Sequence, residues 1–136
     1  MSETTIDFEN NNCFVCGPSN PIGLRIKFHI DGDVCRGEFK PGENHVGYNN
    51  VTHGGIIFSL LDDVMANWLF LKNQIAQTAK CELRYRKPLP INETVILEGR
   101  RIKEKGQIVV MHGLVIHKKL KHIVAESNAK FMVIKS

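Results

Sequence analysis

Residues 45 to 70, HVGYNNVTHGGIIFSLLDDVMANWLF, hold the longest apolar run of the chain and place two adjacent acids inside it. The stretch opens as a loop rich in Asn and Gly and becomes almost entirely apolar after Gly55. Four polar side chains interrupt the apolar run: Ser59, Asp62, Asp63 and Asn67. This pattern predicts a helix over about residues 54 to 72 that is covered on most of its circumference.

Alternating apolar and polar residues on both sides of this helix predict six strands. Before the helix, GLRIKFHIDGD (23–33) alternates and reaches an Asp-Gly turn, and DVCRGEF (33–39) follows as its partner. After Lys72, four more strands lie in the stretches 78–90, 93–105, 107–119 and 122–135. Short connections favour antiparallel pairing. We therefore expect one α+β domain over residues 1–136, in which a curved antiparallel sheet wraps around one helix and residues 1–12 form a loose tail.

Composition excludes several classes of function. A chain of 136 residues with 43% hydrophobic and 24% charged residues is typical of one globular domain. The sequence predicts no membrane insertion, because no apolar run approaches the ~20 residues that span a bilayer. The polar start MSETTIDFENNN does not resemble a secretory signal, so we expect a cytoplasmic protein. The net charge of +4 is modest, and without a recognised binding motif we expect no nucleic-acid partner.

The cysteine pattern is CFVCG at residues 13 to 17, with Cys35 and Cys81 elsewhere. One Cys-x-x-Cys without a second pair or suitably spaced histidines is weak evidence for zinc. A redox motif of the thioredoxin type needs a βαβ context that this chain lacks. We therefore expect Cys13 and Cys16 to serve as small apolar anchors and predict no metal site.

The two acids differ in their positions around the predicted helix. At 100° per residue, Asp63 lies on a polar strip of the helix surface with Ser59 and Asn67. The residues next to Asp62 around the helix are apolar. A carboxylate at an apolar boundary is costly to bury and is enriched at functional sites. The spacing alone leaves open a structural acid paired with Arg or Lys.

The start of the helix supplies a second candidate element. The first backbone N–H groups of a helix lack intrahelical partners, and Gly54 and Gly55 leave them open to a ligand. Such donors suit a carbonyl oxygen that gains negative charge. Asp62 lies about 12 Å further along the same helix, so we expect the acid and the donor to meet across a subunit boundary. Alternatively, the two glycines alone would only mark the start of the helix and have no role in binding.

Three stretches carry a family resemblance over about residues 13 to 134. GYNNVTHGGIIFSLLDDVM (47–65) resembles the His-Gly-Gly-x6-Asp signature of the hotdog-fold acyl-CoA thioesterases of the PaaI type. CFVCGPSNPIGL (13–24) is similar to the opening of a subgroup with human and bacterial members. TAKCELRYRKPL (78–89) looks like the strand that follows the helix in that family.

The resemblance implies a hotdog fold, a homodimer or a tetramer of two dimers, and active sites at the subunit interface. It implies that Asp62 is the catalytic acid, that the Gly54 N–H polarises the thioester carbonyl and that His53 shapes the turn. Thr78, expected from the neighbouring chain, would position the attacking water. Asp63 is expected to be structural.

Substrate contacts are expected at Gly55, Asn50, Arg84, Arg86 and Lys87. Some relatives carry an Asn six residues before the His, where this chain has Gly47, and Asn50 is the candidate substitute. The three basic residues either meet CoA phosphates or form a solvated strand end, and the sequence favours neither.

The expected reaction is hydrolysis of a fatty or aromatic acyl-CoA, with no cofactor and no metal, since the CoA belongs to the substrate. One alternative is a non-catalytic acyl-CoA-binding protein of the same fold. Another is an enoyl-CoA hydratase or dehydratase, which would need a His and an acid over the β-carbon.

Overall fold

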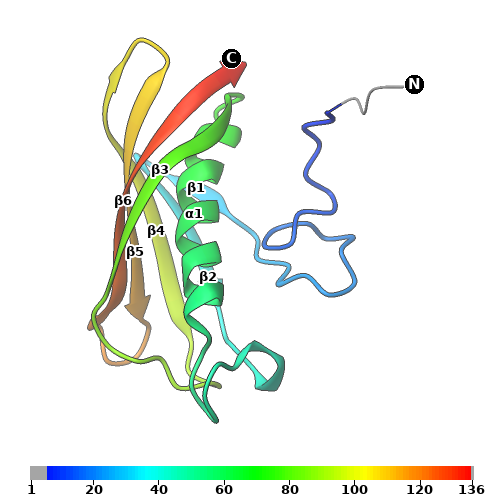
Figure 1. Cartoon of the computed structure of the whole chain (residues 1–136), viewed down its shortest axis with the longest axis vertical. Helices are drawn as coiled ribbons and strands as arrows, with labels where there is room; N and C mark the ends of the chain where they lie inside the picture. The colour runs from blue at the N-terminus through cyan, green and yellow to red at the C-terminus, as the bar shows by residue number, and fades with distance from the viewer. Residues whose placement is uncertain (1–5, 136) are drawn as a thin grey trace.

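The computed structural model describes residues 6–135, which fold into six strands, one long helix and one short 3-10 helix (Figure 1). The helix is α1 (Gly54–Phe70) and the 3-10 helix is η1 (Glu43–His45). The strands are β1 (His29–Asp31), β2 (Val34–Phe39), β3 (Ile75–Tyr85), β4 (Val95–Lys105), β5 (Ile108–His117) and β6 (Ile123–Lys135). They form one antiparallel sheet in the order β1-β2-β4-β5-β6-β3, which confirms the predicted architecture.

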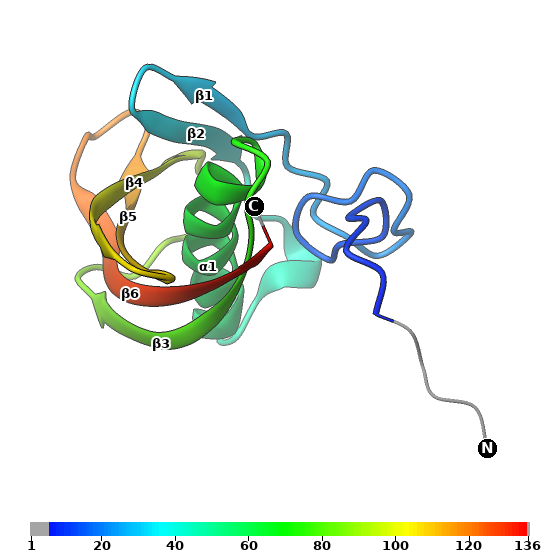
Figure 2. The same cartoon turned by 90° about the horizontal axis from the view of Figure 1, so that it is seen from above.

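The sheet curves around α1, as the view from above shows (Figure 2). The buried side of the helix carries Ile57, Leu60, Leu61, Val64, Met65, Asn67, Trp68 and Leu69. Gly99 of β4 lets the helix approach closely, because a Cβ there would lie 2.7 Å from the Val64 carbonyl oxygen. A helix covered on most of its circumference is what the nearly continuous apolar run requires.

The strand predicted from residue 23 is shorter than expected. Only His29–Asp31 pair with β2, since Arg25 adopts a left-handed φ of 55° that interrupts the extended backbone. Residues 24 and 26 instead donate their backbone N–H groups to Phe14 and Val15 carbonyls. The predicted alternation still holds for burial, because Ile26 is buried while Arg25 and Lys27 are exposed.

The described part of the segment before β1, residues 6–28, lies on the side of α1 that the sheet leaves open (Figures 1 and 2). It joins the core through Val15 and Ile26, which are buried. The part of the predicted loose tail from residue 6 to residue 10 has no regular structure, and residues 1–5 lie outside the described residues. Within the described chain, no helix has the length and apolar character that crossing a membrane requires.

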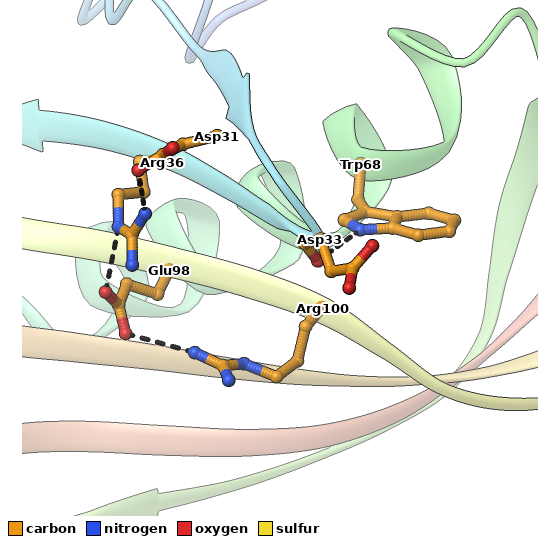
Figure 3. A network of polar contacts seen from close by, with 6 residues as sticks. All are labelled: Asp31, Asp33, Arg36, Trp68, Glu98 and Arg100. Carbon is orange, nitrogen blue, oxygen red and sulfur yellow. Dashed lines mark hydrogen bonds and ion pairs between the residues drawn. The ribbon is translucent and has the colours of Figure 1, made fainter.

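Polar contacts fasten the β1–β2 hairpin to the rest of the domain (Figure 3). Arg36 of β2 pairs with Asp31 and places its Nε 3.0 Å from Glu98 Oε2 of β4. The Trp68 indole donates from Nε1 to the Asp33 carbonyl oxygen at 2.9 Å, which ties the hairpin turn to α1.

We expect Trp68→Phe to lower the free energy of unfolding by about 1–2 kcal/mol, because it removes a buried hydrogen bond and part of a buried ring. Denaturant unfolding of both proteins measures the difference. Tyr48→Phe is the control, since the Tyr48 side chain is 86% exposed and its loss of a hydroxyl should leave stability unchanged. Equal stability of Trp68→Phe and the unchanged protein would contradict the prediction.

Candidate active site

Asp62 and Thr78 form the polar centre of the site. The Thr78 hydroxyl donates to Asp62 Oδ1 at 2.6 Å, and the Asp62 side chain is half-buried between α1 and β3. The hydroxyl donates its one proton to Asp62, and the two lone pairs on its oxygen remain free to accept a hydrogen bond from water. The arrangement gives Asp62 one oriented oxygen and leaves its Oδ2 without a partner among the described residues.

The contact between Asp62 and Thr78 lies within one chain, which corrects the expectation that Thr78 comes from a neighbouring subunit. The helix advances about 12 Å from Asp62 to its end at 1.5 Å per residue. After a short turn, β3 runs back beside it and reaches Thr78 within about 10 Å at 3.3 Å per residue. The two residues therefore meet because the strand returns antiparallel to the helix.

Asp63 faces the N-terminal segment. Asn67 Nδ2 donates to Asp63 Oδ2 at 3.0 Å, and Cys13 Sγ lies 3.6 Å from Asp63 Oδ1. Burial raises the pKa of the Asp63 carboxyl above its usual value, and the nearby Asp62 adds to this effect. The polar contact between Asp63 and Asn67 that the helix periodicity predicted is present. The additional contact with Cys13 was not predicted, because the two residues are 50 positions apart in sequence.

The His-Gly-Gly stretch forms the start of α1. His53 is the N-cap residue, and its Nδ1 accepts from the Gly55 N–H at 2.8 Å. The Ile56 and Ile57 N–H groups bond to the His53 carbonyl. The Gly54 N–H makes no hydrogen bond to any described residue. It is therefore the donor at this helix start that remains available to a ligand.

Tyr85 is a site residue that the sequence reading missed. Its hydroxyl donates to the Gly54 carbonyl oxygen at 2.9 Å, and its ring stands beside the Cα of Gly54. Alternation along β3 places Tyr85 on the same face as Cys81 and Leu83, toward the helix, and this was the available signal. Tyr85 fixes the position of the Gly54 peptide relative to β3.

Asn50 lies in the loop before the helix and has a left-handed φ of 66°. Asn tolerates this conformation better than most residues, which explains its presence in the turn. Its backbone carbonyl accepts from the Ile91 N–H at 3.0 Å, and its side chain is exposed. Gly55 is also exposed, and a Cβ there would lie 3.0 Å from the His53 ring.

The three basic candidates differ in their surroundings. Arg86 is engaged in an ion pair, with Nη2 3.0 Å from Glu126 Oε1. Arg84 and Lys87 are exposed and have no ion-pair partner within residues 6–135. Arg84 alternates with Tyr85 along β3, so it projects from the sheet face that points away from α1.

The acid and the donor do not come together in one chain. Asp62 and Gly54 are eight residues apart on one continuous helix, which separates them by about 12 Å along its axis. The structure brings Thr78 to Asp62 and brings His53 and Tyr85 to Gly54. Each chain therefore presents two candidate half-sites at different levels of α1.

Comparison with known proteins reveals one curated relative and many solved structures of the same fold. An uncharacterised protein of Schizosaccharomyces pombe is 25% identical over 100 residues, which cover 67% of this chain and 51% of that protein. The chain thus spans about half the length of this relative. The match to the thioesterase superfamily model covers residues 49–123 and includes both half-sites.

Three solved structures illustrate the fold. The thioesterase superfamily protein RHA08564 has a TM-score of 0.83 at 22% identity, over 97% of this chain and 68% of that one. The PaaI protein of the E. coli phenylacetic acid degradation operon has a TM-score of 0.76 at 18% identity, over 83% and 82% of the two chains. A hypothetical thioesterase from Streptococcus pneumoniae, solved with coenzyme A, has a TM-score of 0.76 at 14% identity, over 82% and 90%.

These neighbours show that the single helix and its curved six-stranded sheet are a hotdog fold. The family model matches more than half of the chain, from the loop before α1 to the start of β6. By fold and by sequence, the chain belongs to the thioesterase superfamily.

Proposed function

We propose that the protein hydrolyses the thioester of a fatty or aromatic acyl-CoA to the free acid and CoA. The observation that carries the proposal is the Asp62–Thr78 pair, a half-buried carboxylate oriented by a hydroxyl that retains acceptor capacity. The unpaired Gly54 N–H supplies the complementary donor. The structure of a coenzyme A complex of a similarly folded thioesterase supports CoA as the carrier.

In the proposed reaction, a water molecule donates one hydrogen bond to Thr78 Oγ1 and the other to Asp62 Oδ2. Asp62 removes a proton as the water oxygen attacks the thioester carbon. The carbonyl electrons move onto the oxygen, and when they return, the carbon–sulfur bond breaks and CoA leaves as the thiolate. Direct attack by Asp62, through an anhydride that water then opens, uses the same geometry.

The Gly54 N–H is the proposed donor to the developing oxyanion. It stands at the positive end of the α1 dipole, and the next peptide unit, Gly54–Gly55, is held by the hydrogen bond from the Tyr85 hydroxyl to the Gly54 carbonyl. A donor of this kind contributes about 3 kcal/mol to transition-state stabilisation.

A homodimer is part of the proposal because the two half-sites of one chain lie too far apart for one carbonyl group. Support comes from β3, an eleven-residue strand at the edge of the sheet with one unpaired side. A long unpaired edge is a template for pairing with another chain. If two copies pair along β3, Asp62 and Thr78 of one protomer can face Gly54 of its partner. A tetramer of two such dimers is compatible with this arrangement.

Arg84 and Lys87 are the proposed contacts for CoA phosphates, because both are exposed cations without an ion-pair partner in the described part of the chain. Arg86 is less suited, since Glu126 already compensates its charge. A cytoplasmic location, where acyl-CoA is made and used, fits the proposal.

The geometry disfavours the hydratase alternative. His53 Nδ1 is engaged as a helix cap and accepts from the Gly55 N–H, which suits a role in shaping the turn. Within residues 6–135, no histidine is hydrogen-bonded to Asp62.

Thr78→Val is expected to reduce kcat about tenfold, because valine keeps the β-branched shape of the strand residue and removes the hydroxyl that orients Asp62 and the water. Thr78→Ser is the matched control and should retain most of the activity, since it keeps the hydroxyl. Steady-state kinetics on one acyl-CoA compares the three proteins. Equal kcat for Thr78→Val and Thr78→Ser would remove Thr78 from the mechanism.

The test of the function is a thiol-release assay on short, long and aromatic acyl-CoAs, with Asp62→Asn as the blank. We expect CoA release from at least one class that the blank does not produce. An acyl-CoA that binds and stays intact would identify the binding protein instead. In a parallel incubation with an enoyl-CoA, loss of the enoyl absorbance without thiol release would identify a hydratase.

A further inference from the structure

The CFVCG stretch forms a tight turn that brings its two thiols to the same side. The Gly17 N–H donates to the Cys13 carbonyl at 2.9 Å. A Cβ at Gly17 would lie 2.3 Å from the Cys13 backbone nitrogen, so no other residue fits without moving the backbone. The turn faces α1 from the side that the sheet leaves open (Figure 2).

The helix supplies a third ligand-type group to this turn. One thiol sulfur each from Cys13 and Cys16 and one carboxylate oxygen from Asp63 all lie within 4.8 Å of one another. Cys13 Sγ is 3.6 Å from Asp63 Oδ1. In a tetrahedral zinc site with bonds of about 2.3 Å to sulfur and 2.0 Å to oxygen, a sulfur and an oxygen ligand are about 3.5 Å apart. The 3.6 Å between Cys13 Sγ and Asp63 Oδ1 therefore matches such a pair of ligands.

Two amides orient these groups. Asn67 Nδ2 donates to Asp63 Oδ2 at 3.0 Å and lies 3.8 Å from Cys16 Sγ. Asn10 Nδ2 also lies 3.8 Å from the same sulfur. N–H groups directed at a sulfur stabilise its thiolate form, and such outer contacts are typical of metal ligands.

The cluster contains three acidic groups and no basic partner. No ion pair joins Asp63 to a Lys, Arg or His among residues 6–135. A divalent cation would displace the thiol protons and compensate the charge of the resulting thiolates and of Asp63.

A pocket of about 170 Å3 gives access to the cluster. Its lining includes Cys13, Cys16 and Asp63 and, farther along α1, Ala66 and Phe70. A cation therefore has an entry path, and the fourth coordination position can be taken by water. Thiolate ligands select Zn²⁺ and similar soft cations over Mg²⁺ or Ca²⁺.

We propose that Cys13, Cys16 and Asp63 bind a thiophilic divalent cation, Zn²⁺ foremost, which fastens the N-terminal segment to α1 beside Asp62. This departs from the expectation that the cysteines are only apolar anchors, because a third donor comes from the helix, fifty residues away in sequence. The proposal concerns the fold around the site and does not depend on hydrolysis of acyl-CoA.

The experiment is equilibrium binding of Zn²⁺ and Co²⁺ to the reduced full-length protein. We expect one equivalent per chain, thiolate-to-cobalt charge-transfer absorption, and displacement of Co²⁺ by Zn²⁺ but not by Mg²⁺. Cys13→Ser and Cys16→Ser should weaken Zn²⁺ binding by more than about 100-fold. Cys81→Ser is the matched control, because Cys81 lies on β3 beside Ser127 and should leave binding unchanged.

Two further measurements distinguish a loss of metal binding from misfolding of a variant. Zn²⁺ should raise the Tm of the unchanged protein and of Cys81→Ser, but not of Cys16→Ser. It should also protect two of the four thiols from a thiol reagent. The proposal is overturned if the reduced, folded protein binds no Zn²⁺, if Mg²⁺ competes equally, or if Cys81→Ser abolishes binding as fully as Cys16→Ser.

Discussion

Asp62→Asn is expected to lower kcat by a factor of about 10² to 10⁴, because the amide has the size of the carboxylate but can neither accept the proton of water nor attack the thioester. The Thr78 hydroxyl can still donate to the amide oxygen, so the contact between α1 and β3 survives. The Tm should change little. Initial rates of thiol release at saturating acyl-CoA measure the effect.

Two variants make this result specific. Glu104→Gln is a matched acid-to-amide control on the exposed end of β4, and it should leave kcat unchanged. Asp63→Asn should lower kcat less than Asp62→Asn does, because Asp63 faces the N-terminal segment and not Thr78. If Asp63→Asn proved the more damaging of the two, the roles of the adjacent acids would have to be exchanged.

Gly54→Pro and Asp62→Asn, each nearly inactive alone, are expected to rescue one another when mixed. Proline at the first helical position keeps a compatible φ and removes only the N–H. His53 already has the extended conformation that a residue before proline prefers, with φ −61° and ψ 134°. Gly54→Pro therefore deletes the proposed oxyanion donor and leaves the start of α1 intact, with an expected loss of about 10² to 10³ in kcat.

The rescue follows from the placement of the half-sites on different protomers. In a mixed dimer, one site combines both defects and the other combines an intact Asp62 with an intact Gly54 from the partner. Random exchange of subunits should then restore about one quarter of the normal activity. Mild unfolding and joint refolding of the two variants allows the exchange, and thiol release is assayed before and after.

Gly54→Ala is the control for side-chain bulk. A Cβ at this position would meet the Tyr85 ring at 3.6 Å or more, an ordinary contact, and the N–H remains. Gly54→Ala should therefore be more active than Gly54→Pro. Absence of rescue in mixtures shown to contain mixed dimers would mean that the acid and the donor act within one chain, and the interface site would be refuted.

The sequence alone was sufficient for the architecture. The nearly continuous apolar run from Ile56 to Phe70 required a helix covered on most sides, and the alternating stretches required a curved antiparallel sheet to cover it. Hydrophobic periodicity is a local property, so it can be read from neighbouring residues. The shortening of the strand predicted from residue 23 had a local cause that periodicity does not reveal, the left-handed backbone at Arg25.

Only the tertiary structure decided which groups meet. It placed Thr78 on Asp62 of the same chain, Tyr85 on the Gly54 peptide, and Cys13 and Cys16 on Asp63. Each of these contacts joins residues that are far apart in sequence, through a strand that returns beside the helix or a segment that folds over it. The pattern within a single element predicts at most the face on which a side chain lies, whereas the distances depend on the packing of whole elements.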